Sequence, residues 1–279
     1  MSLLRTEPTA RAAKTGRRGR RAFSNPLRAL WRLLAVSLVS FYFFLSYHLT
    51  RPFLPKGVST LPRSLRYTHR WTRGLLRVLG WKVKVEGNPP APGSLLAPNH
   101  MGHADIVAIS SAIPTFFVAK AEVAGWPVVG YMFRKAEHII VTREGTRELP
   151  ATIGEIQKRL EDGFNVCVFL EGTSTGGDRV LPFFPALTQP AIAAAAPLVP
   201  MAIRWQPRAP RIDVSEDIAY WKENHVFAPH AWRLMGFKGI EVKVTFGDPI
   251  LPQGHKRAEL AEEAHRRVLE LTGLGRAAS

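Results

Sequence analysis

The stretch Ser94-Leu-Leu-Ala-Pro-Asn-His-Met-Gly-His-Ala-Asp105 runs from a short apolar segment into a polar loop that contains a glycine. Residues 94–97 are typical of a buried strand, and a helix is predicted to follow the loop. A strand that continues through a short loop into a helix is the repeating unit of α/β folds. Ligands bind at the carboxyl ends of strands in such sheets, so this junction is also a candidate functional site.

Six further segments have the length and the apolar or alternating character of strands, namely 81–86, 115–119, 138–142, 165–170, 198–205 and 240–246. Helical patterns lie between several of them, most clearly at 149–162, which has Pro150 in its first turn, and at 255–272. Strands that alternate with helices predict an α/β fold with a largely parallel sheet and flanking helices. No repeat or linker divides residues 81–279, so we expect a single domain there.

The charge of the chain is concentrated at its N-terminal end. Residues 1–80 hold 16 of the 38 Lys and Arg residues and a single acidic residue, Glu7, whereas the other 199 residues are nearly neutral. A basic excess spread over the fold would indicate nucleic acid, but an excess beside an apolar segment indicates anionic membrane lipids. We therefore expect no nucleic-acid partner. A single cysteine, Cys167, excludes an intramolecular disulfide framework.

Three regions are predicted along the chain. Residues 1–28 are rich in Arg, Ala, Ser, Thr and Pro, and we expect a disordered basic tail. Residues 29–80 are expected to form a membrane-associated helical segment, made of an apolar anchor and a basic amphipathic helix at 62–79. The alternative for the second helix is an ordinary surface helix with a solvated charged face. Residues 81–279 are expected to form the α/β domain.

The anchor is built on an uncharged apolar run at residues 33–47. As a helix, residues 29–50 would cross a bilayer if the Arg32 side chain reached the headgroups. Basic residues before the run favour a cytoplasmic N-terminal side. We expect a membrane location with the basic N-terminus and the α/β domain on the cytoplasmic side. A helix lying in the interface fits the same pattern, and a signal peptide or a buried core helix is the alternative.

His100 and Asp105 are five residues apart, which on a continuous helix would separate their directions by about 140°. They can meet only if His100 lies in the loop and Asp105 in the first helical turn, and Gly102 gives the backbone freedom for that bend. A carboxylate bound to one imidazole nitrogen leaves the other nitrogen as a general base toward a hydroxyl. The alternatives are a structural histidine beside a capping Asp, and a metal site with His103. No other cluster with ligand spacing follows, so we expect no metal.

The second candidate segment is Val168-Phe-Leu-Glu-Gly-Thr-Ser-Thr-Gly-Gly-Asp-Arg179, again a strand that runs into a polar loop. Backbone amides and hydroxyls of such a loop can hold an anion. Gly172-Thr-Ser174-Thr-Gly176 also matches the nucleophile elbow of α/β hydrolases, which makes a serine hydrolase using Ser174 an alternative. An elbow requires a helix directly after the serine, and Pro182 and Pro185 interrupt the following residues.

Taken together, the two segments resemble the glycerophospholipid acyltransferase family, whose type member is 1-acylglycerol-3-phosphate acyltransferase. The family's first motif, Asn-His followed by four residues and Asp, is matched by Asn99, His100 and Asp105. Its Phe-Pro-Glu-Gly-Thr-Arg block is matched at four positions, with Leu170 in place of the proline and Ser174 in place of the arginine. The four matching residues are Phe169, Glu171, Gly172 and Thr173.

Weaker matches extend this resemblance over roughly residues 81–250. They are Lys120-Ala-Glu122, Ile140-Val-Thr-Arg143 and Val199-Pro200. Residues 177–183 and 229–233 are similar to the lyso-ornithine lipid acyltransferase branch of the family.

The resemblance implies that residues 81–279 are an acyltransferase domain. The protein is then a membrane-bound lysolipid O-acyltransferase, which moves a fatty acyl group from acyl-CoA or acyl carrier protein to an acceptor hydroxyl and needs no cofactor. His100 is expected to act as the general base and Asp105 to orient its ring. The alternative outside enzymes is a catalytically inert membrane-surface binding protein.

The acceptor is expected to be of the 1-acylglycerol-3-phosphate or lyso-ornithine lipid type. Lys120, Arg143 and Arg179 are the candidate cations for an acceptor or donor phosphate. Glu171 and Thr173 are expected to shape the acceptor site, because an unshifted glutamate is ionised at pH 7 and cannot act as an acid. The resemblance assigns the replaced arginine to the acceptor phosphate, so Ser174 predicts an acceptor without a terminal phosphate monoester.

Overall fold

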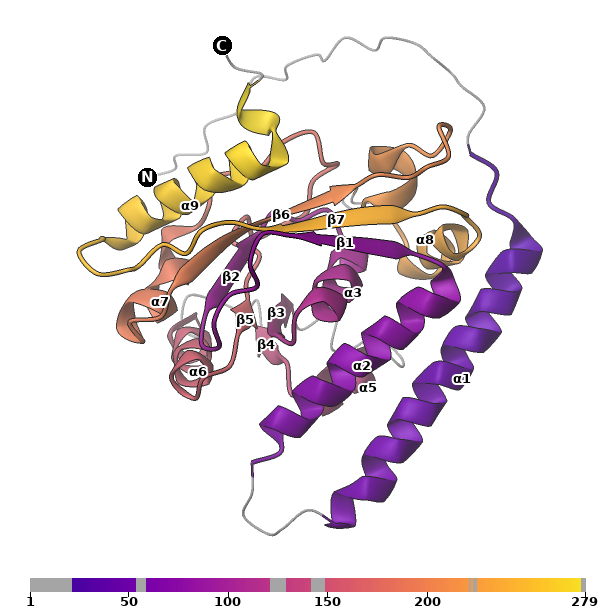
Figure 1. Cartoon of the computed structure of the whole chain (residues 1–279), viewed down its shortest axis with the longest axis horizontal. Helices are drawn as coiled ribbons and strands as arrows, with labels where there is room; N and C mark the ends of the chain where they lie inside the picture. The colour runs from indigo at the N-terminus through magenta and orange to yellow at the C-terminus, as the bar shows by residue number, and fades with distance from the viewer. Residues whose placement is uncertain are drawn as a thin grey trace, which may run out of the picture.

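The computed structural model describes residues 22–53, 59–120, 129–141, 149–220, 222 and 225–276. These residues contain a seven-stranded sheet in the order β1-β7-β6-β2-β5-β3-β4, with helices on both faces (Figure 1). The strands are β1 Lys82–Glu86, β2 Leu95–Pro98, β3 Phe116–Lys120, β4 Ile139–Val141, β5 Val166–Cys167, β6 Leu198–Trp205 and β7 Glu241–Phe246. All seven lie within or next to the predicted segments.

The sheet is mixed because one strand pair is antiparallel. β7 runs antiparallel to β6, whereas each of the other neighbouring pairs is parallel. After β6 the chain stays at the same end of the sheet, and β7 begins beside the residue where β6 stops, with Trp205 paired to Val242. The predicted α/β fold with a largely parallel sheet and flanking helices is confirmed.

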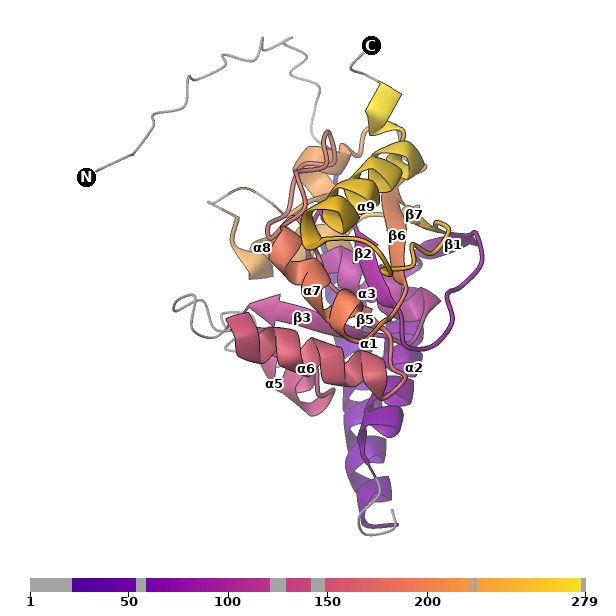
Figure 2. The same ribbon diagram turned by 90° about the vertical axis from the view of Figure 1, so that its left-hand side faces the viewer.

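The helices are α1 Pro26–Thr50, α2 Leu61–Leu79, α3 His103–Ala112, α5 Val129–Lys135, α6 Leu149–Glu161, α7 Gln189–Ala193, α8 Phe227–Met235 and α9 Arg257–Thr272. One sheet face is covered by α6, α7 and α9, and the other by α2, α3 and α8 (Figures 1 and 2). Successive strand residues alternate between the two cores, as Leu95 and Leu96 of β2 do.

The first two helices form a hairpin whose far end extends beyond the sheet (Figure 2). Within the described ranges, α1 is the one helix long and apolar enough to cross a membrane. Its beginning is tied to the α/β domain: the Ser24 hydroxyl donates to the Arg233 carbonyl at 2.7 Å, and Arg28 Nη1 donates to the Gly236 carbonyl at 2.9 Å. Within residues 22–28, which we assigned to the basic tail, Ser24 and Arg28 are therefore bonded to the domain. Residues 1–21 lie outside the described residues.

Two arginines of the hairpin differ from the expectation. Arg32 does not reach outward: it is buried and donates to the carbonyls of Met235, at 2.8 Å, and of Phe237. Arg63 is buried as well, with its guanidinium 4.5 Å from the centre of the Tyr47 ring. Burial of a guanidinium is tolerated when it has partners, and backbone carbonyls supply them for Arg32 and an aromatic ring for Arg63.

Candidate active site

The loop between β2 and α3 is fixed to the sheet by Asn99. Its side-chain Oδ1 accepts from the Ile203 backbone N–H at 2.7 Å, and its Nδ2 donates to the Ile203 carbonyl at 3.1 Å. These two bonds replace ladder bonds of the neighbouring strand β6. The next residue, His100, therefore leaves the sheet at a defined position, above the carboxyl end of β2.

His100 and Asp105 meet across the start of α3. His100 lies in the loop, Asp105 lies in the first helical turn, and His100 Nδ1 is 3.0 Å from Asp105 Oδ2. The His100 ring stacks on the Phe169 ring, with the ring centres 3.7 Å apart and the planes at 22°. Asp105 is fully buried, whereas the His100 side chain keeps 18% of its exposure. A carboxylate only accepts, so Nδ1 carries the proton and Nε2 remains available as a base.

Asp105 is held at both of its oxygens. Oδ2 also accepts from the backbone N–H groups of Met101, at 2.6 Å, and Gly102, at 2.9 Å. Oδ1 accepts from Trp205 Nε1 at 2.9 Å. The N-terminus of α3 further favours a negative charge at this position. Sequence reasoning missed Trp205, because no local pattern connects residues that are 100 positions apart.

Tyr220 is hydrogen-bonded to both candidate loops, the one after β2 and the one after β5. The Tyr220 N–H donates to the Met101 carbonyl at 2.7 Å, and the Ser174 hydroxyl donates to the Tyr220 carbonyl at 2.7 Å. Gly102 has φ 152°, and a Cβ there would lie 2.8 Å from the Tyr220 Cβ and backbone nitrogen. Only glycine permits this approach.

Ser174 is therefore a structural contact in this arrangement. Its proton is donated to a backbone carbonyl, whereas a serine nucleophile needs its hydroxyl bonded to a base. The geometry gives no support to the hydrolase alternative.

Glu171, in the loop after β5, bonds to the loop between β2 and α3. Its Oε1 accepts from the His100 backbone N–H at 2.8 Å, and its Oε2 accepts from the Leu181 N–H at 2.7 Å. Burial raises the pKa of Glu171 to about 7, although the backbone hydrogen bonds oppose this shift. The expectation of an unshifted glutamate is therefore wrong. Its neighbour Gly172 has φ 67°, and a Cβ there would lie 2.6 Å from the Phe184 ring, which explains the glycine.

The remaining candidate residues either are exposed or lie outside the described residues. Thr173 and Arg179 are exposed, and the Arg179 carbonyl accepts from the Thr175 hydroxyl at 3.1 Å. Lys120 ends β3, but its side chain and the whole of Arg143 lie outside the described residues. The role that we assigned to these cations stays a prediction.

A cavity of about 520 Å³ extends from His100 between the helical hairpin and the α/β domain. Its lining includes His100, Ser174 and Tyr220, and α3 contributes the residues three, four and seven positions after His103. Most of the lining is apolar or aromatic, and the hairpin contributes Val36, Phe43, Phe44, Tyr47, Tyr67, Trp71 and Leu75. The sequence did not predict this cavity, because its walls come from elements far apart in the chain.

His103, which we considered as a metal ligand, is packed among aromatic rings. Its ring centre lies 4.9 Å from that of Phe227 and 5.2 Å from that of Tyr220, both nearly edge-on. Burial lowers the pKa of His103 to about 3, so its ring is neutral at pH 7. No group of three or more metal-ligating side chains occurs within the part of the chain that the structure describes.

Comparison with known proteins shows the family to which this chain belongs. A family model described as Acyltransferase matches residues 82–204. The lyso-ornithine lipid O-acyltransferase of Pseudomonas aeruginosa is 30% identical over 212 residues, which cover 76% of this chain and 80% of that protein. The chain belongs to the PlsC-like acyltransferase family.

The chain is also similar to acyltransferases named for 1-acylglycerophosphate. The 1-acyl-sn-glycerol-3-phosphate acyltransferase of Neisseria meningitidis is 32% identical over 179 residues, covering 62% of this chain and 68% of that protein. The crystal structure of the 1-acyl-sn-glycerophosphate acyltransferase PlsC from Thermotoga maritima superposes with a TM-score of 0.65 over 91% of this chain and 97% of that one. At 21% identity, it supports the fold of this PlsC-like acyltransferase.

Proposed function

We propose that this acyltransferase is membrane-bound and transfers a fatty acyl group from a thioester to the hydroxyl of a lysolipid, with His100 as the general base. The observation that carries the proposal is the position of the His100–Asp105 pair. His100, which is bonded to Asp105, lines a largely apolar cavity, so a reacting hydroxyl and a fatty chain can meet there. The printed names of the relatives support a lysolipid acceptor.

The proposed reaction uses direct attack. His100 Nε2 takes the proton of the acceptor hydroxyl as its oxygen attacks the thioester carbonyl carbon. Asp105 keeps the proton on Nδ1 and stabilises the imidazolium that forms. Collapse of the tetrahedral intermediate breaks the carbon–sulfur bond, and the imidazolium returns its proton to the leaving thiolate. The products are the acylated lipid and the free thiol.

The cavity provides room for the fatty chain. Each methylene moved from water into an apolar site contributes about 0.8 kcal/mol, so the cavity binds a long chain strongly without polar contacts. The donor thioester is acyl-CoA or acyl carrier protein, since both present the same reacting group.

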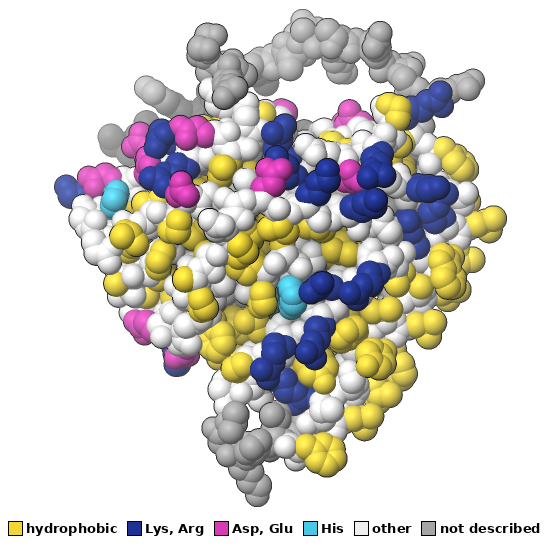
Figure 3. Space-filling view, viewed as in Figure 1, with side chains coloured by type: hydrophobic (Ala, Val, Ile, Leu, Met, Phe, Trp, Pro, Cys, Tyr) yellow, Lys and Arg dark blue, Asp and Glu magenta, His cyan; other side chains and the backbone are white. Residues whose placement is uncertain are grey.

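The hairpin supports membrane association by two adjoining surfaces. The apolar face of α1 is exposed along its length, and exposed arginines of α2 lie beside it (Figure 3). The apolar residues include Leu27, Trp31, Leu34, Leu38, Phe41, Leu45 and Leu49, and the arginines are Arg66, Arg70, Arg73 and Arg77.

A row of arginines is costly in hydrocarbon but favourable among headgroups. The start of α1 is also bonded to the α/β domain through Arg28 and Arg32. We therefore propose that the hairpin lies in the interface, with the outer face of α1 in the lipid. A groove of about 390 Å³ lined by His69, Arg73 and Arg77 suits the phosphate of an anionic lipid. This proposal puts the basic N-terminus and the domain on the cytoplasmic side.

The acceptor proposed here lacks a terminal phosphate monoester and is of the lyso-ornithine lipid type. Ser174 stands where the family motif has an arginine, and its hydroxyl is engaged by the Tyr220 carbonyl. It therefore offers no bidentate grip on a dianionic phosphate.

The test is an acyl-transfer assay with purified protein and labelled donors. Lyso-ornithine lipid and 1-acylglycerol-3-phosphate are offered at equal concentrations, with acyl-CoA and acyl carrier protein in turn. We expect transfer to the first acceptor to be faster. Preference for the phosphate monoester would overturn the acceptor proposal. Binding of lipid without consumption of thioester would support an inert protein, and release of free fatty acid that depends on Ser174 would support a hydrolase.

A further inference from the structure

Trp205 is the last residue of β6 and one of the buried residues beneath the active site. Its indole Nε1 donates to Asp105 Oδ1 at 2.9 Å. The other oxygen, Oδ2, faces His100 and the two backbone N–H groups of the loop. Trp205 thus holds the side of the carboxylate that points away from His100.

We propose that Trp205 is a positioning residue for acyl transfer, which acts by fixing the rotation of the Asp105 carboxylate. This inference rests on the proposed role of His100 as the base. A buried carboxylate oxygen that loses its donor is left unsatisfied, and it regains a partner by rotating or by binding a proton. Either change weakens the bond that holds the His100 ring in its productive tautomer and orientation.

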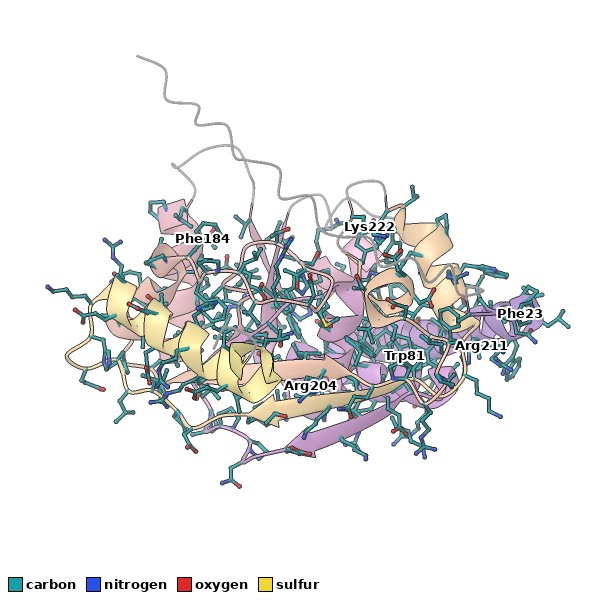
Figure 4. The ribbon with its side chains drawn as sticks, turned by 90° about the horizontal axis from the view of Figure 1, so that it is seen from above. Phe23, Trp81, Phe184, Arg204, Arg211 and Lys222 are labelled. Atoms are coloured by element: carbon teal, nitrogen blue, oxygen red, sulfur yellow. The ribbon has the colours of Figure 1, made fainter. Side chains whose placement is uncertain are left out.

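The structure offers a matched control in Trp81. The Trp81 and Trp205 rings pack edge to face, with centres 5.4 Å apart and planes at 85°. Trp81 lies in the interior between the strands and the helices (Figure 4). Its Nε1 is buried and has no hydrogen-bond partner. Replacing either ring by phenylalanine removes similar volume from the same contact, but only Trp205→Phe removes a donor from Asp105.

The experiment compares Trp205→Phe, Trp81→Phe and wild type in the acyl-transfer assay. We expect Trp205→Phe to lower kcat about 10- to 100-fold with little change in the KM of either substrate, since small misplacements of a catalytic group cost this much. Trp81→Phe should stay within about threefold of wild type, because a packing change of this size does not touch the reacting groups. Thermal unfolding of both variants reports the loss of packing separately.

The rate profile against pH supplies a second readout. The other titratable groups around the pair are His103 on α3, Cys167 on β5 and Glu171 after β5, and both variants retain them. The indole bonds the carboxylate that orients the His100 ring, so its loss changes how strongly that carboxylate stabilises an imidazolium. The acid limb of the kcat profile should therefore move in Trp205→Phe and stay in place in Trp81→Phe.

The outcomes separate this inference from the proposed function. If His100→Ala is inactive but the two tryptophan variants lose equal activity with unshifted profiles, Trp205 is only a packing residue and the inference is overturned. If His100→Ala remains active, the proposed base is wrong, whatever Trp205 does. A shifted profile and a loss in kcat that occur only in Trp205→Phe support the positioning role.

Discussion

Filling the far part of the cavity should shorten the acyl chain that the enzyme accepts. Ser110 lines the cavity and lies seven residues after His103 on α3, roughly 10 Å farther along the helix axis. Ser110→Leu adds two heavy atoms at that depth, and we expect it to exclude about two methylenes of a long chain. At about 0.8 kcal/mol for each methylene, the loss is about 1.6 kcal/mol, or roughly 15-fold in kcat/KM.

The assay measures kcat/KM for a series of saturated acyl donors of increasing length. The loss should appear only for chains long enough to reach Ser110, so short donors should react as with wild type. Ser110→Ala is the control, since it removes the hydroxyl near Thr72 without filling the cavity. An equal loss for all chain lengths, or no loss for the longest donors, would refute the assignment of this cavity to the acyl chain.

The membrane face of α1, the Ser174 hydroxyl and the buried His138 can each be tested by substitution. Leu38→Asp on the exposed face of α1 should leave the fold intact but reduce co-sedimentation with anionic vesicles, and unchanged binding would contradict the proposed membrane face. Ser174→Ala removes one hydrogen bond to the Tyr220 segment and should lower the free energy of unfolding by about 1 kcal/mol while acyl transfer persists. Abolished turnover in a variant that stays folded would support the alternative in which Ser174 is a nucleophile. His138 accepts from the Phe117 N–H, and burial lowers the pKa of His138 to about 3, so its stabilising contribution is present above about pH 6.5 and is lost as pH falls toward 3. His138→Asn keeps an acceptor but does not titrate. Its free energy of unfolding, measured with denaturant, should therefore rise less steeply with pH between 3 and 6.5 than that of wild type, by about 1.4 kcal/mol per pH unit. Equal slopes for the two proteins would exclude His138 as the source of the pH dependence.

The sequence predicted the strands because buried strands leave short apolar runs between turn residues. Residues 198–205 are an example, since seven of the eight side chains of β6 are buried. The direction of β7 was not predictable, because its alternating burial is the same in a parallel and an antiparallel pair. The burial of Arg63 was missed because its spacing is that of the exposed arginines of α2. Its guanidinium packs against Tyr47 of the neighbouring helix, and the sequence of α2 does not show this contact.

The candidate site was predictable only where its contacts are local. His100 and Asp105 are close in sequence, so a turn at Gly102 was enough to predict their contact. The bonds from Trp205 to Asp105 and from Ser174 to Tyr220 join segments that are many residues apart, and such contacts leave no periodicity in the sequence. The shifted pKa of Glu171 was missed because it depends on burial beneath two loops.

The proposed base for acyl transfer is His100. The most direct measurement compares the single-turnover rates of wild type, His100→Ala and His103→Ala with a labelled acyl thioester and saturating lysolipid. His103 is the matched control, because it lines the same cavity but bonds no carboxylate among the described residues. We expect a rate loss of about 10²–10⁴ for His100→Ala and a mild effect for His103→Ala. An inactive His103→Ala beside an active His100→Ala would contradict the role of His100 as the base.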